Sequence, residues 1–340
     1  MKRAVAIFLK YLLFLGLGIF LVWWSIHKMD DKNWADCKAA LRSARYILFL
    51  PVFIILIASH ISRAIRWKIL MRPMGYDPRL TNTFFAVMVG YLANLALPRL
   101  GEILKCTILG KYEKVPADKL VGTILIERAV DVISLVLVFV IAMVTQADII
   151  GEYAKKTISH YFLSGNTQVV ILKSVILIAL LVAIYFLLKF IFKRYREVGF
   201  VKRINILFKG VGAGLASIKN LQNKKAFIFH SIFIWACYAA GTYIGFYAIS
   251  ETAHLPVGAA FPVLAFASIG MVITPGGIGT YPVFVMQVMG LYNIEEGFGF
   301  ANGNLQWLAQ FLIILIAGFI SLLILPYYNK KPVIQPARDV

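Results

Sequence analysis

The sequence has few cysteines, few acidic residues and none of the short motifs that mark common enzymes. Its three cysteines, Cys37, Cys106 and Cys237, form no C-x-x-C pair, so neither a disulfide framework nor a thiolate metal site is indicated. The patterns G-x-x-x-x-G-K-S/T, H-E-x-x-H and G-x-S-x-G do not occur, so nucleotide, zinc-peptidase and serine-hydrolase chemistry lack support. We therefore predict no catalytic residue, no metal and no cofactor, and the sequence does not favour an enzyme.

Apolar residues dominate instead. They make up 60% of the 340 residues, the mean hydropathy is +0.79, and long apolar runs recur along the chain, as in polytopic membrane proteins. Lys and Arg number 35 against 16 Asp and Glu, for a net charge of +19. In a membrane protein such an excess gathers in cytoplasmic loops and fixes orientation, so we predict no nucleic-acid partner.

Six apolar runs are each long enough to cross a bilayer, which takes roughly 20 residues. The first is too long for the core of a signal peptide and lacks a small-residue cleavage site, so we expect it to be retained. Two more apolar segments are interrupted near their middles by proline and glycine. The six runs are 4–26, 46–66, 120–144, 169–192, 226–250 and 305–328, and the two interrupted segments are 81–109 and 258–291.

The charges of the links between these segments predict the topology. The link 193–225 is strongly basic with Glu197 as its one acid, so it belongs on the cytoplasmic side. Its apolar residues recur at helical spacing with lysines and arginines between them, which predicts a basic amphipathic helix on the cytoplasmic leaflet. Four other segments are also basic and are placed on the same cytoplasmic side. They are the amino terminus, the carboxyl terminus and the links 66–79 and 111–119.

Two links without Lys or Arg, 251–258 and 293–304, belong outside. All of these placements hold only if 81–109 enters and leaves from the cytoplasm and 258–291 enters and leaves from outside. The link 27–46 fits poorly, because it is placed outside with five basic and three acidic residues. We predict a multi-pass protein of the cell inner (cytoplasmic) membrane with both termini cytoplasmic.

This order of segments predicts an all-α polytopic membrane protein with about six full spans and two re-entrant helical hairpins in an inverted-topology repeat. We treat 1–340 as a single transmembrane domain, in which a first repeat, 4–144, starts inside and a second, 169–328, starts outside. Paired segments broken by proline and glycine are typical of secondary transporters, whose site lies between them at the midplane. Ordinary kinked spans are the alternative.

Charged residues gather in the apolar segments of the first repeat, where each costs about 2.5 to 3.5 kcal/mol and by default faces a cavity or a partner. A rise of about 1.5 Å per residue places Glu127 about 11 Å along its span and Asp131 near the middle. Spacings of three allow Arg128 to pair with Asp131, and Glu102 with Lys105. The cluster is Arg63, Arg66, Arg99, Glu102, Lys105, Glu127, Arg128 and Asp131.

This cluster has five cations and three carboxylates, and an anionic ligand would balance its surplus of two positive charges. A helix amino-terminus at a hairpin tip would add N–H donors for a phosphate or carboxylate. A self-neutralised ion-pair network that holds the hairpin in place is the alternative. The predicted head-group binding residues are Arg63, Arg66, Asn94, Arg99, Lys105 and Arg128, and the candidates for proton coupling are Glu102, Glu127 and Asp131.

Proline and glycine mark the tips of both predicted hairpins. In the first, we expect Pro98 and Gly101 to make the turn. The second segment is uncharged, and its glycines permit backbone conformations or close approach that a side chain would forbid. An unwound tip that lines the cavity and a plain helix breaker both remain open there. The second tip consists of Pro275, Gly276, Gly277, Gly279 and Thr280.

Four stretches carry a resemblance to a known family. In order they read SRAIRWKILM, GYLANLALPRLGEILK, ERAVDVISL and ITPGGIGTYP. In order and spacing they resemble the lysylphosphatidylglycerol synthase transmembrane region, also called the flippase-like domain family, and the resemblance covers nearly the whole chain. In that family the module occurs fused to an aminoacyl-transferase domain or alone, and we expect this chain to be the stand-alone form.

The resemblance implies lipid translocation or lipid handling. Together with the cationic cluster it leads to the hypothesis of a secondary transporter that moves an anionic lipid, either a phospholipid or a polyprenyl-phosphate-linked sugar, between leaflets of the inner membrane. Two alternatives stay open: a membrane-embedded transferase with one carboxylate as general base, and a non-catalytic partner of a cell-envelope glycosyltransferase. The expected partners are the membrane, an anionic lipid and, in the last case, an envelope-biosynthesis enzyme.

Overall fold

The computed structural model describes residues 15–152, 155 and 221–330, except residues 17, 98, 99 and 150. Every regular element in these ranges is helical, and they contain no strand, which confirms the predicted all-α class for this part of the chain. The predicted span 169–192, most of the link 193–225 and the start of the span 4–26 lie outside the described residues.

The first half of the described chain contains the helices α2 (Asp31–Ser43), η1 (Tyr46–Leu48), α3 (Phe49–Met71), η2 (Arg72–Met74), α4 (Leu80–Ala96), α5 (Leu100–Glu113) and α6 (Ala117–Thr145). The predicted link 27–46 is therefore mostly helix. Helix α2 begins where Asp30 Oδ1 accepts a hydrogen bond from the Asn33 N–H at 2.7 Å, the usual N-cap arrangement. The segments η1, α3 and η2 run on without a break, so this span is longer than the predicted 46–66.

The second half contains α10 (Lys224–Phe246), η3 (Ser250–Thr252), η4 (Val257–Ala259), α11 (Ala260–Ile273), η5 (Pro275–Gly277), α12 (Thr280–Gly290) and α13 (Glu296–Tyr328). Helix α13 begins nine residues before the predicted 305, so most of the predicted link 293–304 is helical. Glycines allow this extension to pack closely on its neighbours. A Cβ on Gly297 would lie 2.2 Å from the Asn33 carbonyl oxygen, and one on Gly303 would lie 2.7 Å from the Pro282 Cα. Close packing therefore fixes this part of α13.

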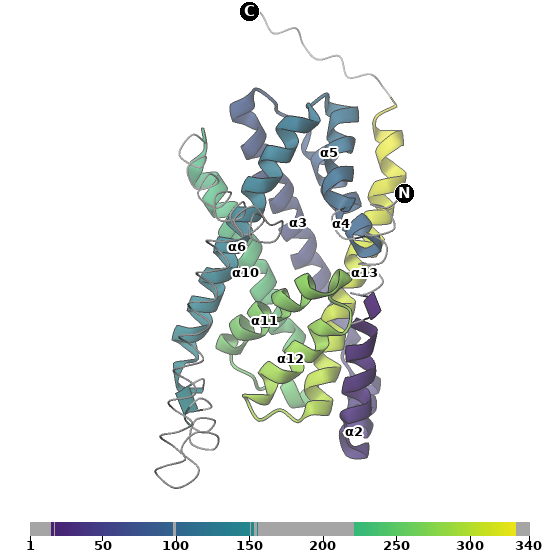
Figure 1. Cartoon of the computed structure of the whole chain (residues 1–340), viewed down its shortest axis with the longest axis vertical. Coiled ribbons are helices and arrows are strands. Elements are labelled where there is room, and N and C mark those ends of the chain that lie inside the picture. Colours follow the sequence, from purple (N-terminus) through teal and green to yellow (C-terminus); the bar gives the residue numbers. More distant parts are fainter. Residues whose placement is uncertain are drawn as a thin grey trace, which may run out of the picture.

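Both interrupted segments fold as helix pairs, which we call hairpin one (α4 and α5) and hairpin two (α11, η5 and α12). Figure 1 shows hairpin one toward the upper end of the molecule and hairpin two toward the lower end. Their tips meet near the middle, where a Cβ on Gly276 would lie 3.2 Å from Leu95 Cδ2. Trp307 on α13 donates from Nε1 to the Gly276 carbonyl oxygen at 2.8 Å and holds the second tip in place.

Polar contacts tie the base of hairpin one to the end of α13. Arg79 donates from Nε to Glu113 Oε1 at 3.0 Å, which joins the two ends of the hairpin. Asn82 and Asn329 exchange amide hydrogen bonds of 2.9 Å in both directions. The described links 66–79 and 111–119 and the end of α13 therefore lie together at one end of the molecule.

The links predicted outside meet at the opposite end. Lys32 pairs with Glu295 at 2.9 Å, and Tyr292 donates to Gln146 Oε1 at 2.8 Å. The Arg45 N–H donates to the Ala248 carbonyl oxygen at 2.9 Å. The described parts of the two groups of links therefore lie at opposite ends of the molecule (Figure 1).

Three of the described helices are long and apolar enough to cross a membrane: Tyr46–Met74, Lys224–Phe246 and Glu296–Tyr328. Large apolar side chains also cover the outer faces of several helices, where they are exposed in the isolated chain. On α6 these include Val132, Val136 and Val140, each about half exposed, at the spacing of one helix face. Such faces suit contact with lipid tails.

Candidate functional site

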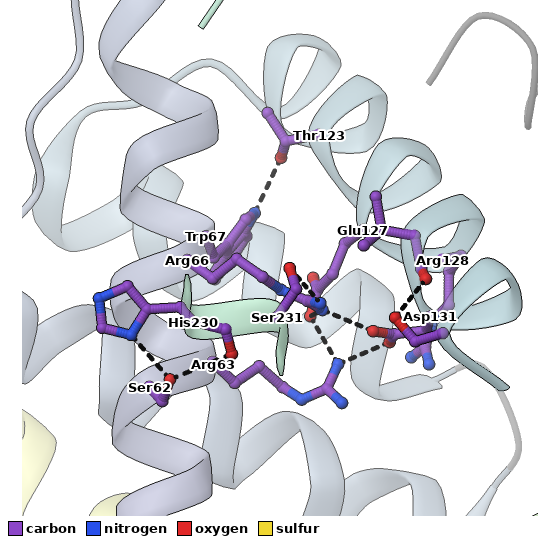
Figure 2. A network of polar contacts seen from close by, with 12 residues as sticks. Ser62, Arg63, Arg66, Trp67, Thr123, Glu127, Arg128, Asp131, His230 and Ser231 are labelled. Carbon is purple, nitrogen blue, oxygen red and sulfur yellow. Dashed lines mark hydrogen bonds and ion pairs between the residues drawn. The ribbon is translucent and has the colours of Figure 1, made fainter. Parts of the chain in front are cut away.

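A buried ion-pair network joins α3 to α6 (Figure 2). Arg63 and Arg66 lie one turn apart on α3, and Glu127 and Asp131 lie one turn apart on α6, so each pair shares a helix face. Arg63 Nη1 contacts Glu127 Oε1 at 3.0 Å and Asp131 Oδ2 at 2.7 Å. Arg66 Nη2 contacts Asp131 Oδ1 at 2.6 Å and Glu127 Oε1 at 3.8 Å. Three charge-assisted hydrogen bonds and one longer ion-pair contact thus connect the four side chains.

Hairpin one supplies a fifth member of this network. Lys105 on α5 donates from Nζ to Glu127 Oε2 at 2.8 Å, and its Nζ lies 4.5 Å from the centre of the Trp67 ring. Trp67 is fully buried and donates from Nε1 to Thr123 Oγ1 at 2.8 Å. The returning arm of hairpin one is thereby held against α3 and α6.

Helix α10 closes the network from another side. Ser62 Oγ lies 2.8 Å from His230 Nδ1, and Arg66 Nη1 donates to Ser231 Oγ at 3.4 Å, as Figure 2 shows. Tyr238, two turns further along α10, accepts from Arg63 Nη2 at 3.4 Å. The charged cluster therefore faces the second half of the chain as well as the first.

The buried part of the cluster has an unbalanced charge. Arg63, Arg66 and Lys105 are three cations, while Glu127 and Asp131 are two carboxylates, which leaves one positive charge in excess. Of these five side chains only that of Asp131 is more than a tenth exposed, at 16%. A buried charge without a counter-charge is costly, so an anion near this cluster would be stabilised.

A second ion pair lies at the accessible edge of the cluster. Arg128 Nε contacts Glu102 Oε1 at 3.1 Å, and the two side chains are 44% and 34% exposed. The sequence spacing suggested pairs along one helix, Arg128 with Asp131 and Glu102 with Lys105. Among the described residues the ion pairs of these groups instead join different helices, because α3, α5 and α6 pack with their charged faces together.

A cavity of about 310 Å³ lies beside the network and between the two halves of the chain. Its charged end consists of Arg63, Arg128 and Asp131, with His60 and Tyr91 next to them. The remaining wall combines apolar residues, mostly of α3 and α13, with neutral polar groups of α10, hairpin two and α13. These lining residues include Phe49, Val52, Leu56, Ala309, Ile313 and Ile314 on the apolar side and Trp235, Tyr238, Thr242, Ser268, Tyr281, Gln306 and Gln310 on the polar side.

The neutral wall is itself hydrogen-bonded. The Tyr281 hydroxyl accepts from Gln310 Nε2 at 3.0 Å and donates to Gln306 Oε1 at 3.4 Å. Gln306 Nε2 donates in turn to Asn302 Oδ1 at 2.7 Å. Hairpin two and α13 are thus joined through the groups that face the cavity.

The predicted head-group binding residues do not all line the cavity. Arg63 and Arg128 line the cavity, whereas Arg66 and Lys105 lie behind them in the network. Asn94 accepts a hydrogen bond from the Gly101 N–H at 2.9 Å and so stabilises hairpin one. Arg99 lies outside the described residues.

The hairpin tips differ in part from the prediction. Pro98 lies outside the described residues, and Gly101 belongs to the first turn of α5 instead of the turn itself. In hairpin two the predicted need for glycine is met, because Gly276 and Gly279 have φ values of 62° and 75°, which a side chain would disfavour. Elsewhere in this tip Pro275 and Gly277 are buried. Thr280 Oγ1 forms a hydrogen bond of 2.7 Å with Thr274 Oγ1.

Sequence reasoning missed several cavity residues, namely His60, Tyr91, Trp235 and Tyr238. His60 lies three residues before Arg63, so helical spacing could have placed both on one face. The aromatic residues of α10 gave no such signal, since aromatic residues are common throughout the chain. Within the described residues no group of three His, Cys, Asp or Glu side chains could hold a metal ion.

Comparison with known proteins adds a family and a relative. The family model described as "Lysylphosphatidylglycerol synthase TM region" matches residues 7–327. The "UPF0104 membrane protein MJ1595" of Methanocaldococcus jannaschii is 23% identical over 287 residues, which cover 80% of this chain and 83% of that protein. No solved structure matches the chain.

Proposed function

Because the chain belongs to the lysylphosphatidylglycerol synthase TM region family, we propose that it binds an anionic lipid by its head group and moves it between the leaflets of the inner membrane. The lipid is a phospholipid or a polyprenyl-phosphate-linked sugar, and the protein acts as a secondary transporter with both termini in the cytoplasm. One observation carries this proposal: a cavity between the two halves ends at a cluster with an excess of positive charge.

The arrangement of the hairpins supports transport over simple binding. Hairpins one and two start at opposite ends of the molecule and their tips meet beside the cavity. In the proposed membrane placement both are re-entrant, and the two halves form an inverted repeat around a site near the midplane. Such a site can be opened to one leaflet or the other by rocking one half against the other.

The carboxylates are unequal as candidates for proton coupling. Both oxygens of Glu127 and both of Asp131 already accept hydrogen bonds from cations, so a proton has to displace a buried partner. Glu102 has Arg128 as its partner and a side chain that is 34% exposed. We propose Glu102 as the group that exchanges protons, while Glu127 and Asp131 hold the arginines in place. The same occupancy disfavours either of them as the general base of a transferase.

Translocation in liposomes tests this function. The purified full chain is reconstituted with a trace of fluorescent phosphatidylglycerol, and external dithionite bleaches the label as it reaches the outer leaflet. We expect the wild-type chain to accelerate bleaching of inner-leaflet label and Arg128→Gln to slow it, because Arg128 lines the cavity at its accessible edge. Arg42→Gln, an exposed arginine of α2, is the matched control and should behave as wild type.

Three results would contradict the proposal. Wild-type protein that neither accelerates bleaching nor binds any anionic lipid excludes a lipid transporter. A new lipid species made in these liposomes when lipid-linked precursors are supplied favours the transferase. Co-purification of a stoichiometric envelope glycosyltransferase, with no lipid effect of Arg128→Gln, favours the partner role.

A further inference from the structure

Three residues that line the cavity each carry a buried nitrogen atom without a hydrogen-bond partner among the described residues. These atoms are His60 Nδ1, Arg63 Nε and Trp235 Nε1, with Arg66 Nε directly behind. The arginine and tryptophan atoms carry a hydrogen and can only donate. A buried donor without an acceptor is destabilising, so these atoms favour a ligand that brings oxygen acceptors.

The charged acceptors near the cavity are already occupied. Asp131 lines the cavity, but its two oxygens accept from Arg63 and Arg66 at 2.7 and 2.6 Å. The Glu102 carboxylate contacts Arg128. An ammonium group that entered the cavity would meet Arg63 and Arg128 with no unpaired carboxylate to balance it, and like charges at close range are strongly unfavourable.

The rest of the cavity wall offers neutral polar groups. Tyr281, Gln306 and Gln310 come from hairpin two and α13, and Trp235 and Thr242 come from α10. Amides, hydroxyls and an indole N–H bind uncharged hydroxyl groups by hydrogen bonding. The cavity volume of about 310 Å³ suits a head group and leaves the acyl or prenyl chains outside.

We propose that the cavity selects a head group in which a phosphate is joined to an uncharged polyol, such as glycerol or a sugar, and rejects head groups that carry an amine. The phosphate lies against Arg63 and Arg128, and a hydroxyl oxygen accepts from Trp235 Nε1. The neutral groups of Tyr281 and Gln310 contact the remaining hydroxyls. This inference rests on the proposed function and specifies its substrate class; it also sets this chain apart from the lysyl-bearing lipid in the family's name.

Three lipids with the same acyl chains test the selection. Phosphatidylglycerol has the phosphate and the polyol, phosphatidylmethanol has the same charge without hydroxyls, and lysyl-phosphatidylglycerol adds amines. Binding to the purified full chain is measured by competition against labelled phosphatidylglycerol. We expect phosphatidylglycerol to bind at least threefold more tightly than phosphatidylmethanol, as the loss of a hydrogen bond implies. Lysyl-phosphatidylglycerol should be weaker by about tenfold or more.

Trp235→Phe isolates the proposed hydroxyl contact, since it removes the unpartnered donor and keeps the ring. It should weaken phosphatidylglycerol binding by about threefold to tenfold and leave phosphatidylmethanol binding unchanged. The melting temperature should not fall, because the wild-type donor is unsatisfied. Trp34→Phe, in α2 and not among the residues that line the cavity, is the control and should change neither affinity.

The outcomes separate this inference from the proposed function. Equal affinity for phosphatidylglycerol and phosphatidylmethanol with a silent Trp235→Phe overturns the polyol contact while anionic-lipid binding stands. Tightest binding of lysyl-phosphatidylglycerol overturns the exclusion of amines. Absence of binding by all three lipids, and by a polyprenyl-phosphate-linked sugar, contradicts the proposed function itself.

Discussion

At the residue scale, Glu127 is the centre of the buried network. It contacts Arg63, Arg66 and Lys105 within 3.8 Å, and its side chain is 3% exposed. Each partner comes from α3 or α5, while Glu127 comes from α6. A single, almost fully buried carboxylate therefore joins three helices to one another.

Removing this charge is expected to destabilise the protein. Glu127→Gln leaves three buried cations facing Asp131 alone, so we predict a loss of about 3–5 kcal/mol in the free energy of unfolding. Thermal unfolding of the detergent-purified protein measures the change. Glu102→Gln is the matched control: its pair with Arg128 is partly exposed, and the loss should not exceed about 1 kcal/mol. Similar shifts for both variants would contradict a central role of Glu127.

The sequence was sufficient to select these charged residues but not to pair them. Arg63, Arg66, Glu127 and Asp131 stand out because ionisable groups in apolar runs are costly. Their partners depend on how α3, α5 and α6 pack, and helical spacing alone carries no information on that. The neutral cavity residues, such as Trp235 and Tyr238, are ordinary in an aromatic-rich span. Their place in the cavity wall follows only from the packing of the two halves.

At the element scale, hairpin one depends on close contact between its two helices. A Cβ on Gly101 would lie 1.9 Å from the Gly90 carbonyl oxygen and 2.8 Å from the Asn94 side chain. Real Cβ atoms do not approach so closely, so α4 and α5 would have to separate. Because Lys105 follows one turn later on α5, that shift would also pull Lys105 away from Glu127.

Gly101→Ala should therefore be strongly destabilising. We predict a cost of about 1–3 kcal/mol from overpacking, and slower lipid translocation, because the tip of hairpin one moves. Gly122→Ala on α6 is the control, since an added Cβ there meets nothing within 4 Å and alanine favours a helix over glycine by about 0.5–1 kcal/mol. Thermal unfolding and the dithionite assay measure both variants. Equal stability of the two would show that the hairpin contact is looser than described.

The element boundaries were only partly predictable. Proline and glycine correctly marked the break in hairpin two, whereas in hairpin one Gly101 lies within α5. The helical character of residues 296–304 was not apparent, because its glycines and asparagines are typical of a loop. Those glycines instead allow contact with Asn33 and Pro282, so tertiary packing overrides the local preference.

At the scale of the whole molecule, the separation of the two groups of links makes the topology testable. Single cysteines are introduced at the exposed positions Lys111 and His254, which lie at opposite ends. A membrane-impermeant maleimide should label His254→Cys in intact spheroplasts, and Lys111→Cys only after permeabilisation. Labelling of both in intact spheroplasts would contradict re-entrant hairpins and the placement of both termini in the cytoplasm.

The native cysteines should not interfere with this experiment. Cys37, Cys106 and Cys237 are between 1% and 8% exposed. Burial raises the pKa of the Cys37 thiol to about 11, so this group stays protonated at neutral pH, and a thiol reacts far more slowly than a thiolate. Wild-type protein is therefore the background control.

An experimental structure in lipid nanodiscs containing phosphatidylglycerol tests most directly whether the cavity between the two halves binds an anionic head group. We predict phosphate density inside the cavity, in contact with Arg63 and Arg128, with the acyl chains leading out between helices. An empty cavity, with lipid density confined to the outer surface of the protein, would contradict the account.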